Sequence, residues 1–237
     1  MGKEKDNISM PNLSKDRCVL FYVKYPEKGE VKTRLSSYLD ETITVELYRN
    51  FILDLLSKLE KLPVEFCICF YPQNAKEKFV EWLGRRYFYI PQEGEDLGQR
   101  MKNSFLQAFA AGFRRVILIG SDSPDLPSSL ISEAFSFLKT HDAVIGPTLD
   151  GGYYLVGFNK GSFLPKVFDG MKWSTSKVYE NTLSFFKKGK HKIHILPKWQ
   201  DVDTINDLKE LFKKNKDTEF GKSKTICYLL KYKDMFK

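Results

Sequence analysis

The 237-residue sequence contains few of the residues that build zinc sites and disulfide frameworks. It has three histidines and four cysteines, and no Cys-x-x-Cys pair occurs. Reduced cysteines in the core are therefore favoured over a disulfide network or a zinc centre. No apolar run approaches the roughly 20 residues that a transmembrane helix needs, and residues 1–16 lack the apolar centre of a signal peptide. These absences predict a cytoplasmic protein without a transmembrane segment, whose residues 1–16 are loosely ordered.

One signature of nucleotide-binding proteins and one signature of hydrolases are also missing. The sequence has no G-x-x-x-x-G-K loop, so it is not a P-loop nucleotide-binding protein. It has no G-x-S-x-G motif, and its histidines are too scattered for a catalytic triad. A hydrolase with a serine nucleophile is therefore not supported.

The formal net charge of +8 is concentrated in the last part of the chain. Residues 185–237 contain fourteen lysines and seven acidic residues, whereas the charges of the preceding residues nearly balance. A Lys-rich end is more often a solvated surface than a contact for RNA or anionic lipid. We expect no DNA partner.

Short apolar segments alternate with segments of helical periodicity along the chain. Strands are predicted over 18–23, 64–70, 87–90, 115–120, 142–146, 153–158 and 191–196, and helices over 41–59, 75–83, 97–111, 126–138, 175–186 and 204–214. This alternation predicts an α/β fold with a mostly parallel sheet between two helical layers. A single domain is expected over 17–212, followed by a Lys-rich extension over 213–237. Ligands of such folds bind where the carboxyl ends of the strands open, so the loops that follow the strands are the candidates for a site.

The loop after the first strand has the composition of a phosphate-binding loop. The segment Lys24-Tyr-Pro-Glu-Lys-Gly-Glu-Val-Lys-Thr-Arg-Leu35 supplies three cations, a flexible backbone and a hydroxyl donor through Lys28, Gly29, Lys32, Thr33 and Arg34. Polyphosphates are bound by these groups. The alternative is a solvated basic loop.

Aspartates follow two of the other strands. Asp122 and Asp125 lie in Gly120-Ser-Asp-Ser-Pro-Asp-Leu-Pro127, directly after the most apolar strand, and Asp201 and Asp203 precede the last helix. Mg²⁺ is often held by one or two carboxylates together with substrate phosphates. Asp122 is interpreted as functional and Asp125 as structural. Asp201 or Asp203 could complete a metal site with Asp122 if their strands are neighbours.

Two further segments carry candidate residues. In Asp150-Gly-Gly-Tyr-Tyr154 the glycines permit a tight turn that lets the backbone and Asp150 approach a small acceptor, and the alternative is a plain hairpin. Asp96 and Arg100 flank the start of a helix, in a plausible position for nucleotide contacts. Thr204 and Asp207 are spaced as a capping box for the last helix.

Together these segments resemble a known family. Val31-Lys-Thr-Arg-Leu35, Asp96-Leu-Gly-Gln-Arg-Met101, Gly120-Ser-Asp-Ser-Pro-Asp-Leu126, Gly146-Pro147, Asp150-Gly-Gly-Tyr-Tyr154, Trp173-Ser-Thr175 and Asp201-Val-Asp-Thr204 occur in this order. The conjunction is similar to a bacterial and archaeal family of glycosyltransferase-A-like proteins, labelled radical-SAM/selenodomain-associated transferases or arsenosugar-biosynthesis glycosyltransferases. The resemblance covers residues 17–212. Guanylyltransferases that activate phospholactate or phosphoenolpyruvate share the Lys-Thr-Arg-Leu segment more distantly.

The resemblance implies the nucleotide-diphospho-sugar transferase fold, a Rossmann-like three-layer sandwich of the GT-A type. It implies that Lys32 and Arg34 contact phosphates and that Asp122 and Asp203 bind Mg²⁺ or Mn²⁺. The sequence departs from the family pattern at Ser123, where a cysteine is common, and at Glu95, where a glycine is common. Neither change removes a proposed ligand.

The expected function is metal-dependent transfer from a nucleotide-diphosphate donor, first of all glycosyl transfer to a small-molecule acceptor. The expected catalytic residues are Asp122, Lys32, Arg34 and Asp150. The alternative is nucleotidyl transfer to a phosphorylated acceptor with release of pyrophosphate, which needs the same residues. A second alternative is a non-catalytic nucleotide- or RNA-binding module.

Overall fold

The computed structural model describes residues 16–173 and 175–232, and within them all seven predicted strands are present with small shifts at their ends. The strands are β1 (Arg17–Lys24), β2 (Glu65–Tyr71), β3 (Phe88–Pro91), β4 (Arg115–Ile119), β5 (Ala143–Pro147), β6 (Tyr153–Asn159) and β7 (Ile193–Ile195). The α-helices are α1 (Thr33–Ser36), α2 (Glu41–Leu59), α3 (Lys76–Leu83), α4 (Leu97–Ala110), α5 (Ser128–Phe137), α6 (Val178–Lys188), α7 (Ile205–Asn215) and α8 (Lys224–Leu230). Short 3₁₀ turns lie at η1 (Lys160–Ser162), η2 (Pro165–Phe168) and η3 (Glu219–Lys222).

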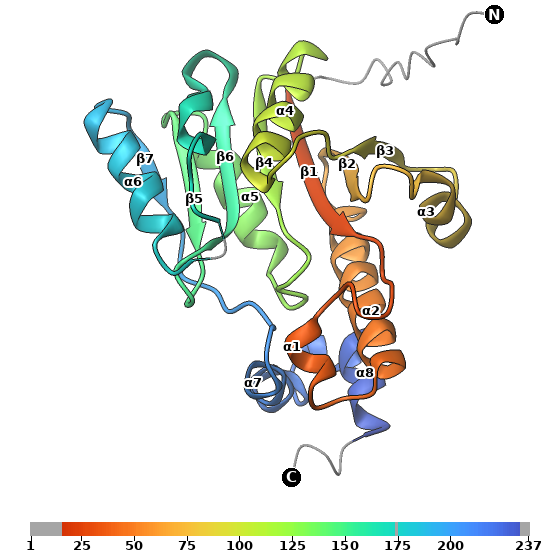
Figure 1. Ribbon diagram of the computed structural model, residues 1–237. Coiled ribbons are helices and arrows are strands. Elements are labelled where there is room, and N and C mark those ends of the chain that lie inside the picture. The colour runs from red at the N-terminus through yellow and green to blue at the C-terminus, as the bar shows by residue number, and fades with distance from the viewer. Residues whose placement is uncertain (1–15, 174, 233–237) are drawn as a thin grey trace, which may run out of the picture.

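The strands form one mixed sheet in the order β3-β2-β1-β4-β6-β5-β7. Strand β6 is antiparallel to both of its neighbours, and the other pairings are parallel. The chain builds outward from β1 through β2 and β3, and then returns to place β4 on the other side of β1 (Figure 1). The two loops that leave β1 and β4 therefore diverge and open a crevice at their carboxyl ends, where such sheets bind ligands.

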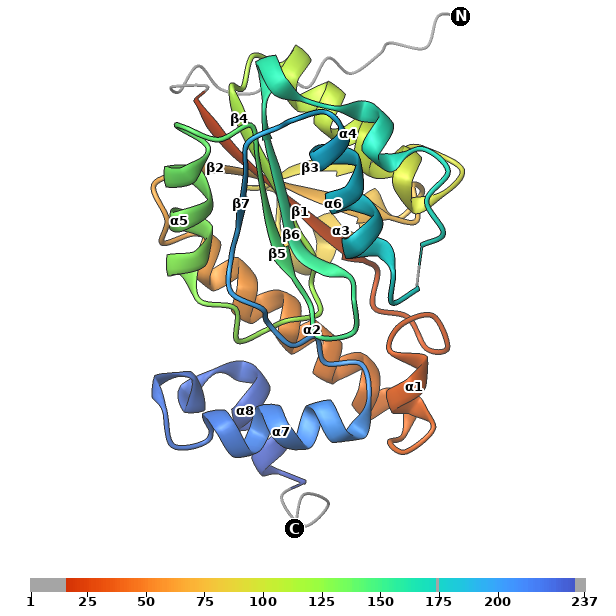
Figure 2. The same cartoon turned by 90° about the vertical axis from the view of Figure 1, so that its left-hand side faces the viewer.

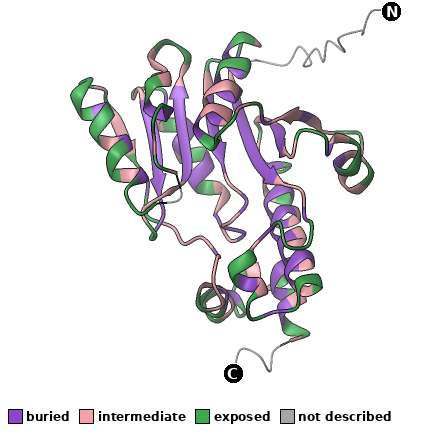
Figure 3. Ribbon diagram, in the orientation of Figure 1, coloured by how far each residue is buried: buried purple, intermediate pink, exposed green. Residues whose placement is uncertain are grey.

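Helices cover both faces of the sheet, as the view along it shows in Figure 2. On β1, Val19 and Phe21 belong to the apolar cluster under α2 and α5, whereas Cys18 and Leu20 belong to the cluster under α4 and α6. This alternation follows from the two-residue period of a strand, and both faces are apolar because both are covered. The buried strands and the exposed outer faces of the helices are evident in Figure 3. The predicted three-layer α/β sandwich with a mostly parallel mixed sheet is confirmed.

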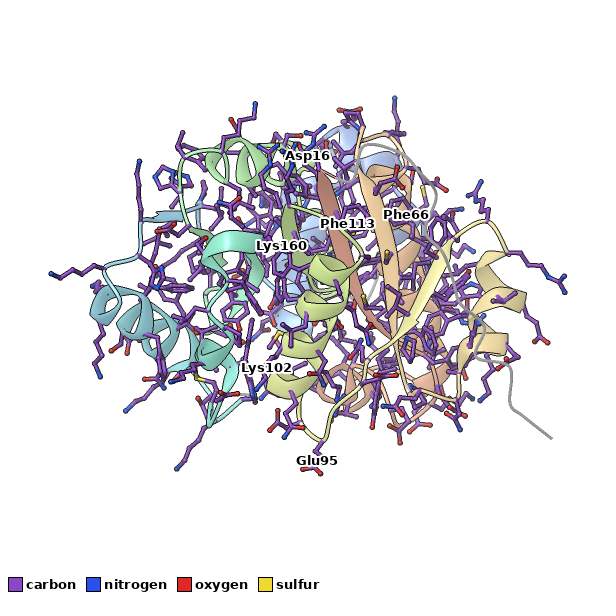
Figure 4. All side chains as sticks on the ribbon, turned by 90° about the horizontal axis from the view of Figure 1, so that it is seen from above. Asp16, Phe66, Glu95, Lys102, Phe113 and Lys160 are labelled. Atoms are coloured by element: carbon purple, nitrogen blue, oxygen red, sulfur yellow. The ribbon has the colours of Figure 1, made fainter. Side chains whose placement is uncertain are left out.

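The amino ends of the parallel strands are closed by side chains. Asp16, just before β1, accepts a hydrogen bond from Arg114 at 3.1 Å and also pairs with Arg115 at the start of β4. Seen from above in Figure 4, Asp16 and Phe113 lie beside the starts of these strands. The opposite, carboxyl end of these strands is open and is lined by polar side chains.

Part of the expected C-terminal extension is folded onto the domain. Beyond Phe212, α8 packs on α2, and Ile226 and Leu229 are buried in the same cluster as α2. The Asp54 carboxylate of α2 accepts hydrogen bonds from the backbone N–H groups of Lys224 and Thr225, at 2.9 and 2.8 Å. Apolar residues spaced along this lysine-rich segment explain the difference, since they form a buried face that its net charge conceals. The expectation for residues 1–15 lies outside the described residues, as do residues 233–237.

In the described part of the chain, no helix combines the length and the apolar character that membrane crossing requires.

Candidate active site

A cleft of about 640 Å³ opens at the carboxyl ends of β1 and β4. Its lining comes from the loops after both strands, from the start of α4, from the β5–β6 turn and from the segment before α7. A smaller hollow of about 280 Å³ adjoins it and shares Lys24, Arg34, Tyr48, Asp122 and Asp203 with the cleft. The predicted loops therefore converge on one site, where the fold class places ligands.

Lys32 lies at the centre of this site, between two carboxylates. Its ammonium is 2.5 Å from Asp122 Oδ1 and 2.8 Å from Asp203 Oδ1. The Lys32 side chain is 4% exposed, whereas those of Asp122 and Asp203 are 46% and 41% exposed. Burial opposes the charged ammonium, but the two carboxylates outweigh it and raise the pKa of Lys32 above its ordinary value. Lys32 is therefore a charged, buried lysine that contacts both carboxylates. Each carboxylate is still partly exposed to the cleft.

Backbone geometry aims Lys32 at this position. The residue has φ 48° and ψ 43°, a left-handed conformation uncommon for a residue with a side chain, directly before the short helix α1. Gly29, in the preceding turn, has φ 73°, which glycine adopts without steric cost. The loop after β1 thus turns sharply at Gly29 and Lys32, and the second turn points the lysine inward.

Asp203 reaches Asp122 by a route that the sequence did not predict. Strands β4 and β7 are not neighbours, because β6 and β5 lie between them. The chain after β7 instead runs back across the ends of β5 and β6, and the Val202 N–H donates to the Asp122 carbonyl oxygen at 2.8 Å. The Thr204–Asp207 capping box is present at the start of α7 and fixes the chain directly after Asp203. The two strands are not neighbours, which the prediction had required, but Asp122 and Asp203 both contact Lys32.

Asp201 differs from the carboxylate pair (Asp122 and Asp203) in its surroundings. It accepts a hydrogen bond from Ser123 Oγ at 2.5 Å. Burial, together with the nearby charge of Asp122, raises the pKa of Asp201 to about 7. Its carboxyl group supports the loop that carries Asp122, through the serine that stands where the family pattern has cysteine.

Two arginines line the cleft on different elements. Arg34 lies on α1 and lines both hollows, and Arg100 of α4 lies over the ring of Tyr71 with its guanidinium carbon 4.2 Å from the ring centre. Among residues 16–173 and 175–232, neither arginine has a carboxylate partner within ion-pair distance. Thr33 lines the smaller hollow beside Lys32. Cations without a carboxylate partner in a cleft can bind an anionic ligand.

The other predicted site residues are placed less directly. Lys28 and Gly29 belong to the loop but do not line either hollow, and Asp96 caps α4 by accepting a hydrogen bond from the Gln99 N–H at 2.8 Å. Asp150 lines the cleft but accepts hydrogen bonds from the Thr148 hydroxyl and, at 3.1 Å, from the Gly152 N–H. The structure thus gives Asp96 and Asp150 local structural partners. Their roles toward a ligand stay predictions.

A second group of polar residues, which we call the anchor cluster (Lys58, Asp125, Trp199 and Asn215), lies behind the loop after β4. Asp125 accepts hydrogen bonds from Trp199 Nε1 at 2.9 Å and from Asn215 Nδ2 at 3.1 Å. Lys58 donates to the carbonyl oxygens of Pro124 and Leu126, at 2.8 and 2.9 Å. The cluster ties α2, the segment after β7 and the end of α7 to the loop after β4, and it agrees with the interpretation of Asp125 as structural.

Sequence reasoning missed several residues of the cleft wall. Tyr48 of α2 shares a hydrogen bond of 2.7 Å with Ser121, and burial raises its pKa to about 12. Gln92, which follows β3, donates to the carbonyl oxygens of Val23 and Cys69, at 3.3 and 2.8 Å. Tyr48 reads as one more apolar residue of a helix, so its polar end gave no signal. Gln92 could have been noticed, because it is a polar residue placed directly after a strand.

The donor set around the cleft fits a divalent cation that a ligand helps to hold. The described residues contain no cluster of three or more histidine, cysteine or acidic side chains with metal-binding geometry. The side chains of the carboxylate pair are about half-exposed and line the cleft, so two carboxylates can supply oxygen ligands there. Mg²⁺ commonly accepts this number when phosphates and water complete its shell.

Comparisons with known proteins agree with this fold. Residues 55–175 match the family described as "Uncharacterized protein conserved in bacteria (DUF2064)". The chain belongs to this DUF2064 family. A crystal structure from Desulfovibrio desulfuricans G20, provisionally assigned as a nucleotide-diphospho-sugar transferase, is 43% identical, with coverage of 94% of this chain and 97% of the other and a TM-score of 0.91. The expected resemblance to the nucleotide-diphospho-sugar transferase superfamily is thereby confirmed.

Other similar proteins are also transferases. A 2-phospho-L-lactate guanylyltransferase from Methanocaldococcus infernus is 25% identical over 187 residues, which are 78% of this chain and 80% of the relative. A cytidylyltransferase from Leptospira borgpetersenii has a TM-score of 0.55 at 16% identity over 93% of this chain and 96% of the other, which shows the common fold. The DUF2064 chain is thus a transferase by its relatives, as expected, whereas its donor and acceptor are matters for proposal.

Proposed function

We propose that this protein is a metal-dependent nucleotidyltransferase that joins a nucleoside triphosphate to a small phosphorylated acceptor. The observation that carries the proposal is the site at the β1–β4 crevice, where Lys32 and Arg34 lie beside the half-exposed carboxylate pair. This combination of cations, carboxylates and open space serves a polyphosphate and its metal. The guanylyltransferase relative and the shared Lys-Thr-Arg-Leu segment favour nucleotidyl over glycosyl transfer.

The reaction is a substitution at phosphorus. An oxygen of the acceptor's phosphate forms a bond to the α-phosphorus of the triphosphate, and the bond from that phosphorus to the bridging oxygen of the β-phosphate breaks. Pyrophosphate leaves with the electron pair. Negative charge therefore grows on the leaving group, and catalysis of such steps depends mainly on groups already placed to stabilise it.

The residues of the loop after β1 have clear tasks in this scheme. Arg34 and Thr33 face the smaller hollow and bind phosphate oxygens, Arg34 through a fork of N–H donors. Lys32 adds a positive charge at the inner end of the hollow. Arg100, on the other wall of the cleft, is available to a second anionic group.

Asp122 and Asp203 would hold the metal, since both line the cleft, both are about half-exposed, and both contact the same buried lysine. Bound there, Mg²⁺ or Mn²⁺ would neutralise charge on the phosphates. Asp201, which is partly buried and accepts a hydrogen bond from Ser123, orients the loop instead. Asp150 and Gly152 lie in the cleft wall on the β5–β6 turn, where an acceptor would bind.

A thermal-shift panel tests the donor class. Nucleoside triphosphates and nucleotide sugars are each added with and without Mn²⁺ to the wild type and to Asp122→Asn. A ligand that binds the native state raises the melting temperature by mass action. We expect a Mn²⁺-dependent shift with one triphosphate that is lost in Asp122→Asn. The absence of any shift with every nucleotide would contradict the proposal.

Glycosyl transfer is the second candidate function, and the observation that favours it is the 43% identity to a provisional nucleotide-diphospho-sugar transferase. Pyrophosphate release separates the two reactions. A nucleotidyltransferase releases it from a triphosphate in amounts equal to the nucleotidylated product. A glycosyltransferase releases a nucleoside diphosphate from a nucleotide sugar and no pyrophosphate.

A further inference from the structure

The ammonium of Lys32 lies where a bridging cation between the two carboxylates would be expected to bind. It contacts one oxygen of Asp122 and one of Asp203 at hydrogen-bond distance, and the three residues come from segments far apart in the sequence. The ammonium is thus the resident counter-ion of the carboxylate pair. The two carboxylates, and not solvent, balance the charge of the ammonium, because the lysine side chain is almost completely buried.

A divalent cation that bound the pair alone would meet this ammonium at close range. Like charges repel strongly in a partly buried site, where the effective dielectric constant is far below that of water. The other carboxylates that line the two hollows have local partners: Glu30 pairs with Lys24, Asp150 accepts hydrogen bonds from the Thr148 hydroxyl and the Gly152 N–H, and Asp201 accepts one from Ser123. Among the described residues, Asp122 and Asp203 are the carboxylates paired with Lys32. Lys32 and the two carboxylates sum to a charge of −1, so a divalent ion alone would leave a net positive site.

The phosphates of a nucleotide change this balance. They bring several negative charges into a hollow lined by Lys24, Arg34 and Thr33, next to Lys32. In their presence the ammonium gains anionic partners other than Asp122 and Asp203, and the carboxylate oxygens become available to the metal. The charge of each ligand then favours the binding of the other.

We propose that the carboxylate pair admits a divalent metal only together with nucleotide phosphates, and that Lys32 enforces this coupling by serving as the pair's counter-ion until they bind. This inference rests on the proposed function, and it defines the true ligand of the site as the metal–nucleotide complex. The ammonium repels free metal ions from the nucleotide-free site. A nucleotide that arrives without metal is repelled in turn by the two carboxylates.

The test measures binding of Mn²⁺ alone, by electron paramagnetic resonance of the free ion, without any nucleotide. The wild type is compared with Lys32→Met, which keeps an unbranched side chain, one atom shorter, and removes its charge. We expect Lys32→Met to bind Mn²⁺ about tenfold or more tightly than the wild type, because the competing charge is gone. The gain should disappear in the double variant Lys32→Met with Asp122→Asn, which would locate the ion at the carboxylate pair.

Two further variants act as controls. Lys102→Met removes a lysine whose ammonium lies 2.8 Å from Asp169 Oδ1, and neither residue lines the cleft or the smaller hollow. This variant should leave Mn²⁺ affinity unchanged. Figure 4 shows Lys102 on α4. Lys32→Arg keeps the charge and should bind Mn²⁺ as weakly as the wild type, so it still tests the inference if Lys32→Met does not fold.

Wild-type affinity for Mn²⁺ alone equal to that of Lys32→Met, or a tight Mn²⁺ complex of Lys32→Arg, would overturn the inference. These arms contain no nucleotide, so their result does not depend on the reaction that the enzyme catalyses. Failure of the proposed function is seen separately, as the absence of any thermal shift of the wild type with nucleotide and Mn²⁺ together.

Discussion

The carboxylate pair and the anchor cluster each include one aspartate of the loop after β4, Asp122 and Asp125, yet they use their charged groups in opposite ways. Asp122 is half-exposed and keeps an open side toward the cleft, whereas the side chain of Asp125, three residues later, is 5% exposed and accepts hydrogen bonds from Trp199 and Asn215. The lysines differ as well. Carboxylates raise the pKa of Lys32, whereas burial lowers that of Lys58 to about 8.

The contrast separates function from architecture. In the anchor cluster each polar group is satisfied by a protein partner, and the result is a fixed loop. In the carboxylate pair the protein supplies one buried cation and leaves the outer oxygens open, which is the arrangement of groups that await a ligand. The anchor cluster therefore fixes the loop that carries Asp122, and the proposed metal binding falls to the carboxylate pair.

The largest expected effect breaks the pair and spares the anchor. Asp122→Asn should lower kcat/KM about 100- to 1,000-fold, because a neutral amide is a poor ligand for the metal that balances the phosphates. The free energy of unfolding should fall by no more than about 1 kcal/mol, since the amide oxygen and Asp203 can still accept from Lys32. Steady-state kinetics and urea unfolding measure the two quantities. Full activity of Asp122→Asn would remove Asp122 from the site.

The reverse pattern is expected at Asp125. Asp125→Ala leaves Trp199 Nε1 and Asn215 Nδ2 without their acceptor behind the loop, so the free energy of unfolding should fall by about 3 kcal/mol. Nucleotide binding by the folded fraction should change less than it does in Asp122→Asn. Urea unfolding checks the first statement, and a nucleotide titration well below the melting temperature checks the second. If Asp125→Ala instead abolishes binding at unchanged stability, the division between the two groups is wrong.

The pKa of Lys58 gives a pH test of the anchor cluster. Burial lowers its folded pKa to about 8, below the ordinary value of 10.5, so between these pH values the unfolded chain binds more protons than the folded one. Stability then rises with pH across this window, because the cost of burying a charged Lys58 is present below pH 8 and is lost as the folded group deprotonates. Between about pH 7.5 and 9.5, the contribution should increase by about 2 kcal/mol.

The measurement is the difference in unfolding free energy between the wild type and Lys58→Met, taken at several pH values. Other titrating groups cancel in this difference, and the lost hydrogen bonds of Lys58 add a constant offset. We expect the wild type to gain relative to the variant as the pH rises. A flat difference would show that Lys58 keeps an ordinary pKa.

Much of the fold and part of the site could be predicted from the sequence. Apolar periodicity located the strands and most helices, because burial on both faces leaves a continuous apolar pattern in β1 and β4. Motif order located Lys32, Arg34, Asp122 and Asp203. The contact between Lys32 and both carboxylates could not be foreseen, since it depends on a left-handed turn at Lys32 and on a chain crossing after β7 that leaves no local pattern.

The C-terminal segment shows the same limit from another side. Its lysines suggested a solvated extension, whereas the packing of α8 depends on a few apolar residues and on Asp54, a carboxylate in the middle of a helix that is distant in sequence. Nothing near Asp54 in the sequence indicates that its partners lie about 170 residues later. Partnerships over such separations follow from the assembled fold.

Asp54 provides the smallest predicted effect and extends the contrast to a third carboxylate. Like Asp125 it is buried and accepts from protein donors, here the N–H groups of Lys224 and Thr225 at the start of α8. Asp54→Ala should therefore lower the free energy of unfolding by about 1 to 2 kcal/mol, the usual cost of losing a helix cap, and leave nucleotide binding intact. Hydrogen exchange should rise first in α8, because its first turn loses the acceptor. If exchange in α8 is unchanged while stability falls, Asp54 instead stabilises the fold through its charge, which favours the protonated form of the nearby Lys58.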